Sequence, residues 1–287
     1  MRTPLAPHAA TRQSRRPLAH GAVTCPRPVP GAALRLFLFH HAGGSHLLYR
    51  GWEHEFPADW EVCVLDAPGR GRLVDTPFID DCDKLVAFFA TELRPWTDRP
   101  FAFFGHSMGS LVAYELTRRL EAEGRPLPVW LGVSSCGAPQ EDRDRRASRS
   151  RHLFTDGELR DWLRSVGGTP DAVLNDEAAW RVFGPRFRND FALVDTWRPA
   201  ARTEPLRTPV SAFGGDGDPV VGRERLSAWA GRTERFLGLN TFDGGHFYLA
   251  DHRRAVARRV TAAVAAARRA SGHAGTTPDP CAMLGTS

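Results

Sequence analysis

A serine, an aspartate and a histidine each follow an apolar segment of this chain, and these three residue types together can carry out acyl transfer. Ser107 lies between glycines in the run Gly105-His106-Ser107-Met108-Gly109. The apolar residues before this run predict a buried strand, and the apolar residues at helical spacing after it predict a helix. Such a turn presents the serine hydroxyl clear of the backbone and aims helix N–H groups at whatever it attacks. We therefore predict that Ser107 is a nucleophile.

A serine hydroxyl is a weak nucleophile at neutral pH, so it needs a general base that a carboxylate orients. Four histidines follow the serine in the chain: His152, His246, His252 and His273. Only His246 comes after a predicted strand and lies in a glycine-rich loop, Asp243-Gly244-Gly245-His246-Phe247. The glycines let the imidazole approach the serine without steric conflict. We predict His246 as the general base; the alternative is a histidine whose hydrogen bonds are satisfied in the core or on the surface.

Two aspartates compete for the role of the orienting acid. Asp216 and Asp218 both lie in the glycine-rich loop after the strand predicted at 209–213. Asp218 directly precedes Pro-Val-Val, where hydrolases with the chain order serine, acid, histidine usually hold the carboxylate. Asp216 is expected to support the turn through its own backbone hydrogen bonds, so Asp218 is favoured. Two further aspartates are less favoured because they lie so close to the histidine in the chain: Asp243 and Asp251.

Backbone N–H groups are expected to hold the oxyanion of the tetrahedral intermediate. One predicted donor is the N–H of Met108, and the second is the N–H of Ala42 in the loop His41-Ala42-Gly43-Gly44. The pair His40 and His41 is not predicted to bind metal, because adjacent strand residues point to opposite faces and zinc needs further ligands. No Gly-Lys-Ser/Thr follows the glycines, which excludes a phosphate-binding loop. No cofactor is predicted.

The elements that must position these residues alternate between strand and helix. Strands are predicted at 34–39, 61–65, 100–104, 129–134, 209–213 and 235–242. Helices are predicted at 82–93, after Ser107 as far as Gly124, and at 248–269. With the serine turn, this alternation predicts an α/β-hydrolase fold with a mostly parallel, doubly wound sheet. Between about 140 and 206 the alternation gives way to helices rich in charge and tryptophan, which we predict to form a lid.

Length and composition fit one domain with two tails. The chain has 287 residues, of which 42% are hydrophobic, and no run approaches the roughly 18 apolar residues of a membrane span. We predict a domain at 32–271 between a disordered basic tail at 1–31 and a disordered tail at 272–287. The net charge of +5 matches the five arginines of the first thirty residues, which leaves a neutral body and argues against nucleic-acid binding. Removal of residues 1–30 is therefore expected to leave hydrolysis unchanged.

Cysteine usage and the first residues bear on location and assembly. The chain has five cysteines, an odd number without CxxC spacing, which favours free thiols over disulfides. The first thirty residues lack the apolar stretch of a secretory signal, so we expect a cytoplasmic protein. We also expect a monomer that binds neither nucleic acid nor membrane.

The chain resembles the stand-alone type II thioesterases of polyketide and nonribosomal peptide synthesis from about Arg35 to Arg269. The likeness rests on seven motifs in one order: Phe39-His40-His41-Ala42-Gly43-Gly44, Pro68-Gly69-Arg70, Gly105-His106-Ser107-Met108-Gly109, Val166-Gly167-Gly168-Thr169-Pro170, Phe187-Arg188-Asn189-Asp190-Phe191, Gly215-Asp216-Gly217-Asp218-Pro219 and Phe242-Asp243-Gly244-Gly245-His246-Phe247. Two departures are His40, where the family usually has proline, and Gly71-Arg72, where it has an acidic pair. Both lie beside the predicted site and bear on substrate preference.

The resemblance implies a role for each predicted site residue. Ser107 would be the nucleophile, Asp218 the acid and His246 the base, with Ala42 and Met108 as oxyanion donors. It further implies that the enzyme hydrolyses acyl groups, typically aberrant short acyl units, from the phosphopantetheine arm of an acyl or peptidyl carrier protein. The helical insertion would then shape an acyl chamber with a narrow entry for the arm.

Two other functions remain open at this point. A carboxylesterase or acyltransferase of the same fold would use the same serine, histidine and aspartate, so these residues do not separate thioesters from oxygen esters. A catalytically silent binding module of the same fold is the second alternative. It is disfavoured because all three residues are present.

Overall fold

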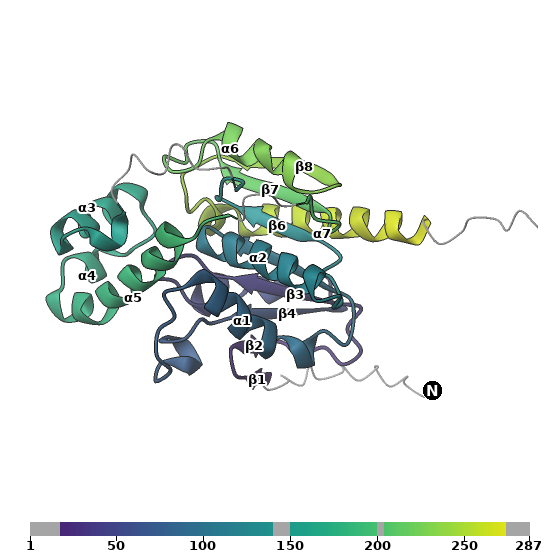
Figure 1. The fold of residues 1–287 in the computed structure, drawn as a ribbon, viewed down its shortest axis with the longest axis horizontal. Coiled ribbons are helices and arrows are strands. Elements are labelled where there is room, and N and C mark those ends of the chain that lie inside the picture. The colour runs from purple at the N-terminus through teal and green to yellow at the C-terminus, as the bar shows by residue number, and fades with distance from the viewer. Residues whose placement is uncertain (1–17, 140–149, 200–203, 274–287) are drawn as a thin grey trace, which may run out of the picture.

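An eight-stranded sheet forms the centre of the molecule (Figure 1). The computed structural model describes residues 18–139, 150–199 and 204–273. The strand order is β1-β2-β4-β3-β5-β6-β7-β8, and every neighbouring pair from β4 to β8 is parallel. The strands are β1 Leu18–His20, β2 Val23–Cys25, β3 Leu34–Phe39, β4 Trp60–Leu65, β5 Phe101–His106, β6 Leu131–Ser134, β7 Val210–Gly215 and β8 Phe236–Phe242.

Helices cover both faces of this sheet (Figure 1). On one face lie α1 Cys82–Glu92, α2 Met108–Ala122 and the short α6 Arg223–Ser227, and on the other lies α7 Leu249–His273. The central strands are buried along their whole length and mostly apolar, as expected for a parallel sheet that is covered on both faces. The charged Arg35 of β3 and Glu61 of β4 form an ion pair with each other. The predicted α/β-hydrolase architecture, with its mostly parallel sheet, is confirmed.

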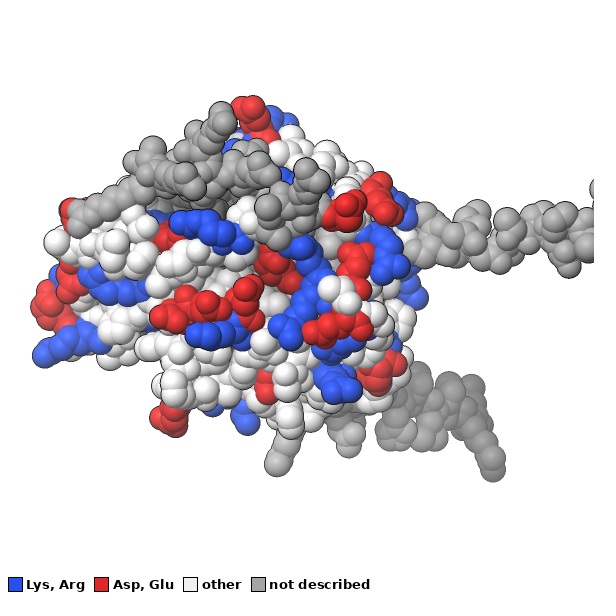
Figure 2. Space-filling model, in the orientation of Figure 1, with Lys and Arg blue, Asp and Glu red and all other residues white. Residues whose placement is uncertain are grey.

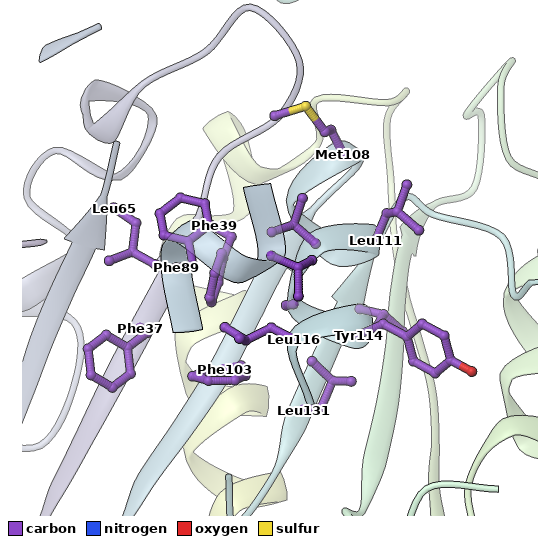
Figure 3. Close-up of a cluster of buried hydrophobic side chains, with 14 of the residues drawn as sticks. Phe37, Phe39, Leu65, Phe89, Phe103, Met108, Leu111, Tyr114, Leu116 and Leu131 are labelled. Atoms are coloured by element: carbon purple, nitrogen blue, oxygen red, sulfur yellow. The ribbon is translucent and has the colours of Figure 1, made fainter. Parts of the chain in front are cut away.

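Alternate residues of one strand enter different cores. Phe37 and Phe39 of β3 pack toward α1 and α2, whereas the leucines that alternate along the strand, Leu34, Leu36 and Leu38, pack toward α7. Figure 3 shows Phe37, Phe39 and Phe103 from neighbouring strands facing Phe89 of α1 and Leu116 of α2. Phe39 and Phe103 meet edge to face with ring centroids 5.2 Å apart. This packing fixes the carboxyl ends of β3 and β5, where the predicted oxyanion loop and nucleophile begin.

In the described part of the segment between β6 and β7, three α-helices project beyond the sheet (Figure 1). They are α3 Asp156–Val166, α4 Asp171–Leu174 and α5 Glu177–Thr196, and no strand lies among residues 150–199. They enclose a core of their own, and α3 starts with a capping box in which Thr155 and Glu158 bind each other's backbone N–H. We call α3, α4 and α5 the lid. Residues 140–149 and 200–203 of the predicted lid lie outside the described residues.

The ordered fold begins earlier than the predicted Ala32. Strands β1 and β2 form an antiparallel hairpin around Gly21 and Ala22, and β2 pairs with β4. Gly21 has φ +52°, a conformation that suits the first loop position of a tight hairpin. This hairpin was not predicted, because two strands of three residues each are too short to show an alternating pattern in the sequence. Of the predicted tails at 1–31 and 272–287, residues 1–17 and 274–287 lie outside the described residues. Helix α7 continues to His273, past the predicted helix end at 269 and the predicted domain end at 271.

Charge and thiols follow simple patterns in the described parts of the chain. Positive and negative side chains are interspersed on the face shown in Figure 2. No described helix is both long and apolar enough to cross a membrane. Cys25, Cys63 and Cys82 are buried free thiols, as predicted, and Cys281 lies outside the described residues.

Candidate active site

Ser107 occupies a strained turn between β5 and α2. Its backbone has φ 54° and ψ −118°, a positive φ that side-chain-bearing residues rarely adopt. The flanking glycines make this turn possible, because a Cβ on Gly105 would lie 2.2 Å from the Gly109 carbonyl oxygen. A Cβ on Gly109 would in turn lie 2.3 Å from the Phe39 carbonyl oxygen. Within the described ranges the Ser107 hydroxyl makes no hydrogen bond, so it is free to meet a ligand.

His246 and Asp218 are joined by a hydrogen bond of 2.9 Å between Nδ1 and Oδ2. The side chains come from the loops after β8 and β7, and both residues are buried. The other Asp218 oxygen accepts the Val220 and Val221 N–H groups at 2.8 and 3.1 Å, which fixes the carboxylate. This contact orients the imidazole with Nδ1 toward the acid and Nε2 available as an acceptor.

The charge state of Asp218 follows from two opposing effects. Burial alone would raise the pKa of Asp218, but the His246 hydrogen bond and charge and the bound N–H groups lower it, and the net pKa lies below the usual value. The carboxylate is therefore ionised at neutral pH. Asp216, by contrast, is exposed, with its carboxylate 3.6 Å from Arg223. The structure thus brings Asp218, and not Asp216, against the histidine.

Ser107 and His246 line the same cavity, whose volume is about 420 Å³. Its walls combine α2, the loop after β6 and the lid, and Met108 belongs to them. The apolar part of the wall consists mainly of Leu111, Phe154, Trp162, Val194, Trp197, Val220, Val221 and Trp229. One polar feature is Arg151, whose guanidinium binds Asp195 and lies over the Phe191 ring, 4.7 Å from its centroid. A cavity of this size and apolarity suits an acyl chain.

The predicted oxyanion donors also lie beside Ser107. Ala42 lines a smaller cavity together with Ser107 and His246. Met108 is the first residue of α2, and helix geometry leaves its N–H without an intrahelical acceptor. The loop that carries Ala42 turns at Gly43, which has φ +76° and lies against the Phe187 ring.

Two neutral histidines, His40 and His41, lie at the start of this loop. The pKa of His40 falls to about 3 because the ring is buried and lies near Arg70, and burial lowers the pKa of His41 to about 4. His40 uses both ring nitrogens, donating from Nδ1 to the His41 carbonyl oxygen at 2.7 Å and accepting the Ala67 N–H at Nε2. The ring of His41 also forms a hydrogen bond to the backbone, at the carbonyl oxygen of Ala42. Both rings therefore fix neighbouring backbone groups through hydrogen bonds.

One cluster in the described part of the chain has the donor types of a metal site. Cys25, Glu61 and Cys63 bring their ligand atoms within 4.8 Å of one another, away from Ser107. However, Glu61 already binds Arg35 at 2.5 Å, and the two sulfurs lie 2.7 Å apart, which is closer than two ligands of one ion sit. The cluster does not fit a metal ion without rearrangement.

A buried ion pair, Arg70 with Asp190, lies beside the site, and no role was predicted for either residue. Arg70, in the loop after β4, binds Asp190 of α5 through two hydrogen bonds of 2.6 and 2.7 Å. Burial alone would raise the pKa of Asp190, but Arg70 holds it below its usual value. Both residues occur in motifs that carried the resemblance. The pairing was not visible in sequence because the two positions are 120 residues apart.

Comparisons with known proteins show which family this chain belongs to. The family described as Thioesterase domain matches residues 34–264. The chain is 37% identical to the gramicidin S biosynthesis protein GrsT of Aneurinibacillus migulanus, over 76% of this chain and 84% of that protein. It is 32% identical to the thioesterase PikA5 of Streptomyces venezuelae, over 78% of each. The structure of the type II thioesterase BorB from the borrelidin cluster is similar, with TM-score 0.76, 34% identity, and coverage of 86% of this chain and 100% of that one.

Proposed function

The chain belongs to the thioesterase family, among the type II thioesterases of polyketide and nonribosomal peptide synthesis, and from this we propose that it hydrolyses acyl thioesters with Ser107, His246 and Asp218 as catalytic triad. The supporting observation is the His246–Asp218 hydrogen bond, whose histidine shares one cavity with the serine. Asp218 orients the imidazole, so that Nε2 can take the serine proton.

The proposed reaction has two halves. In the first, Ser107 attacks the thioester carbonyl while His246 takes its proton, and the oxyanion rests on the Ala42 and Met108 N–H groups. The intermediate then collapses, His246 gives the proton to the leaving sulfur, and the thiol departs from the acyl-enzyme. In the second half, His246 deprotonates a water molecule that attacks the acyl-enzyme, and Ser107 regains its proton as the free acid leaves.

We propose that the substrate is an acyl group, in particular an aberrant short one, on the phosphopantetheine arm of an acyl or peptidyl carrier protein. The names of the relatives place them in gramicidin S and borrelidin biosynthesis, where substrates are carried in this way. The apolar part of the cavity wall suits the acyl part of such a substrate. The enzyme would act as a cytoplasmic monomer, with the carrier docked beside the cavity mouth.

A serine-reactive phosphonate tests the nucleophile. We expect stoichiometric labelling of the wild type and loss of both labelling and thioester hydrolysis in Ser107→Ala. A matched control is Ser110→Ala, because Ser110 lies one helical turn on and binds backbone carbonyls instead of facing the cavity. Failure of the wild type to react would favour a silent binding module.

Carrier recognition is tested by comparing acetyl- and propionyl-carrier proteins with the corresponding acyl-CoA thioesters. Both contain the same pantetheine thioester, so a difference in kcat/KM reports the contribution of the carrier. We expect faster hydrolysis from the carriers. Equal rates on both would remove the case for carrier recognition and leave a general thioesterase.

A further inference from the structure

The buried Arg70–Asp190 pair joins the lid to the loop that carries the predicted oxyanion donor. Arg70 is 0% and Asp190 1% exposed. The guanidinium meets the carboxylate side by side, with each of two nitrogens facing a different oxygen. One partner belongs to the lid helix α5, and the other to the loop after β4.

Each member of the pair also holds one backbone group of the oxyanion loop. The Gly43 N–H donates to Asp190 Oδ2 at 2.6 Å. Arg70 Nη1 donates to the Gly44 carbonyl oxygen at 3.1 Å. Because these groups directly follow Ala42 in the chain, the ion pair fixes the path of the backbone just after the donor.

The peptide unit between Ala42 and Gly43 is held at both of its polar atoms. Its N–H binds Asp190, and its carbonyl oxygen is bonded to the His41 ring at 2.8 Å. The Ala42 N–H belongs to the preceding peptide unit, whose carbonyl oxygen accepts the Gly44 N–H at 3.0 Å. Because the two units share the Cα of Ala42, displacement of the held unit would displace the Ala42 N–H as well. Gly43 and Gly44 have more conformational freedom than other residues, so this backbone depends on its hydrogen bonds, including those to Asp190 and Arg70, to keep its path.

The lid helix α5 also packs against the same loop. A Cβ added to Gly43 would lie 2.0 Å from the nearest carbon of the Phe187 ring, so the ring packs directly against the glycine. Phe187 and Asp190 are three residues apart on α5 and therefore share one helix face. A single face of the lid helix thus supplies both a packing contact and an anionic acceptor to the loop.

We propose that Asp190, with Arg70, is a positioning residue that holds the Ala42 N–H in place for the oxyanion. The lid helix then has a second task besides enclosing the acyl group, because it sets the geometry of transition-state stabilisation. The inference rests on the proposed function above. It assigns Asp190 no contact with the substrate.

The experiment uses the double variant Arg70→Met with Asp190→Leu. Replacing both partners avoids leaving one buried charge unpaired, and such replacements often leave stability unchanged. The matched control is Glu177→Gln on the same helix, which removes the exposed ion pair with Arg160 and touches nothing in the loop. Thermal unfolding and circular dichroism verify that both variants are folded.

Three readouts separate positioning from a structural role. We expect kcat of the double variant to fall roughly 10- to 100-fold while KM changes less than about threefold, because a displaced donor affects the transition state. Affinity for a trifluoromethyl ketone analogue, which forms an oxyanion with Ser107, should fall by the same factor. Affinity for the matching thioether, which forms no oxyanion, should stay unchanged, and Glu177→Gln should match the wild type in all three.

Arg70→Lys is the conservative variant and also serves if the double variant does not fold. It keeps a cation beside Asp190 but cannot reach both the carboxylate and the Gly44 carbonyl, so we expect kcat and ketone affinity between those of the wild type and the double variant. Folded variants with wild-type kcat and wild-type ketone affinity would overturn the inference. If Ser107→Ala also hydrolysed thioesters normally, the proposed function would fail with it; an inactive Ser107→Ala would confine the failure to the positioning role.

Discussion

Two aspartates two residues apart have opposite surroundings in this protein. Asp218 is buried against His246 and accepts two backbone N–H groups, whereas Asp216 lies in solvent. The position of Asp218 before Pro-Val-Val was enough to choose between them in sequence. Their nearness allows a comparison of two substitutions with the same chemistry.

We expect Asp218→Asn to lower kcat by about 10³- to 10⁴-fold, since an amide no longer fixes the imidazole with Nε2 as acceptor. Asp216→Asn should leave kcat unchanged. Steady-state hydrolysis of one acyl thioester by both variants provides the measurement. Equal losses in the two variants would contradict the assignment of the acid.

At the level of elements, the hairpin β1–β2 is the main addition that the structure makes to the sequence analysis. Val23 and Cys25 of β2 are 0% exposed, and β2 covers the edge of β4. A strand edge without this cover presents unpaired backbone groups to other molecules. We therefore revise the expectation that removal of residues 1–30 leaves hydrolysis unchanged.

Deletion of residues 1–17 should leave the melting temperature unchanged, because the described hairpin remains complete. Deletion of residues 1–30 removes β1 and β2, and we expect it to lower the melting temperature by several degrees and to promote aggregation. Differential scanning calorimetry and light scattering on both truncated proteins make the comparison. An unchanged melting temperature after the longer deletion would show that the hairpin contributes nothing to stability.

At the scale of the whole molecule, buried histidines link stability to pH. Burial lowers the pKa of His40 to about 3 and of His41 to about 4, and it lowers the pKa of His106 as well. In the unfolded chain these side chains titrate near about 6.5. Between about pH 6.5 and 4 the unfolded state therefore binds more protons than the folded state.

The free energy of unfolding should be highest above about pH 6.5 and should decrease as the pH falls, by up to about 1.4 kcal/mol per pH unit for each histidine. Urea unfolding between pH 8 and pH 5 measures this slope. His106→Asn should reduce the slope of the unfolding free energy against pH by up to about 1.4 kcal/mol per pH unit, the contribution of one proton. This reduction is expected whether or not the substitution also changes the stability at pH 8. A free energy independent of pH over this range would contradict the neutral, buried state of these rings.

Local patterns predicted most of the fold and the site residues. Apolar runs located β3 to β8, and the glycines around Ser107 located the turn, because each of these features depends on neighbouring residues. The Arg70–Asp190 pair and its hold on Gly43 depend on residues that are distant in the chain, and no local pattern marks which charges become buried. The same reason explains why β1 and β2 were missed, since β2 is placed by its pairing with the distant β4 and β1 by its pairing with β2.

Three of the chain's eight tryptophans, Trp162, Trp197 and Trp229, line the cavity at Ser107. Indole emission moves to shorter wavelength when water around the ring is replaced by hydrocarbon. The protein consequently contains its own optical reporter, and filling of the cavity can be followed by intrinsic fluorescence without any label. Titration of the inert Ser107→Ala protein with acyl-pantetheine thioesters of increasing chain length would then rank their affinities directly.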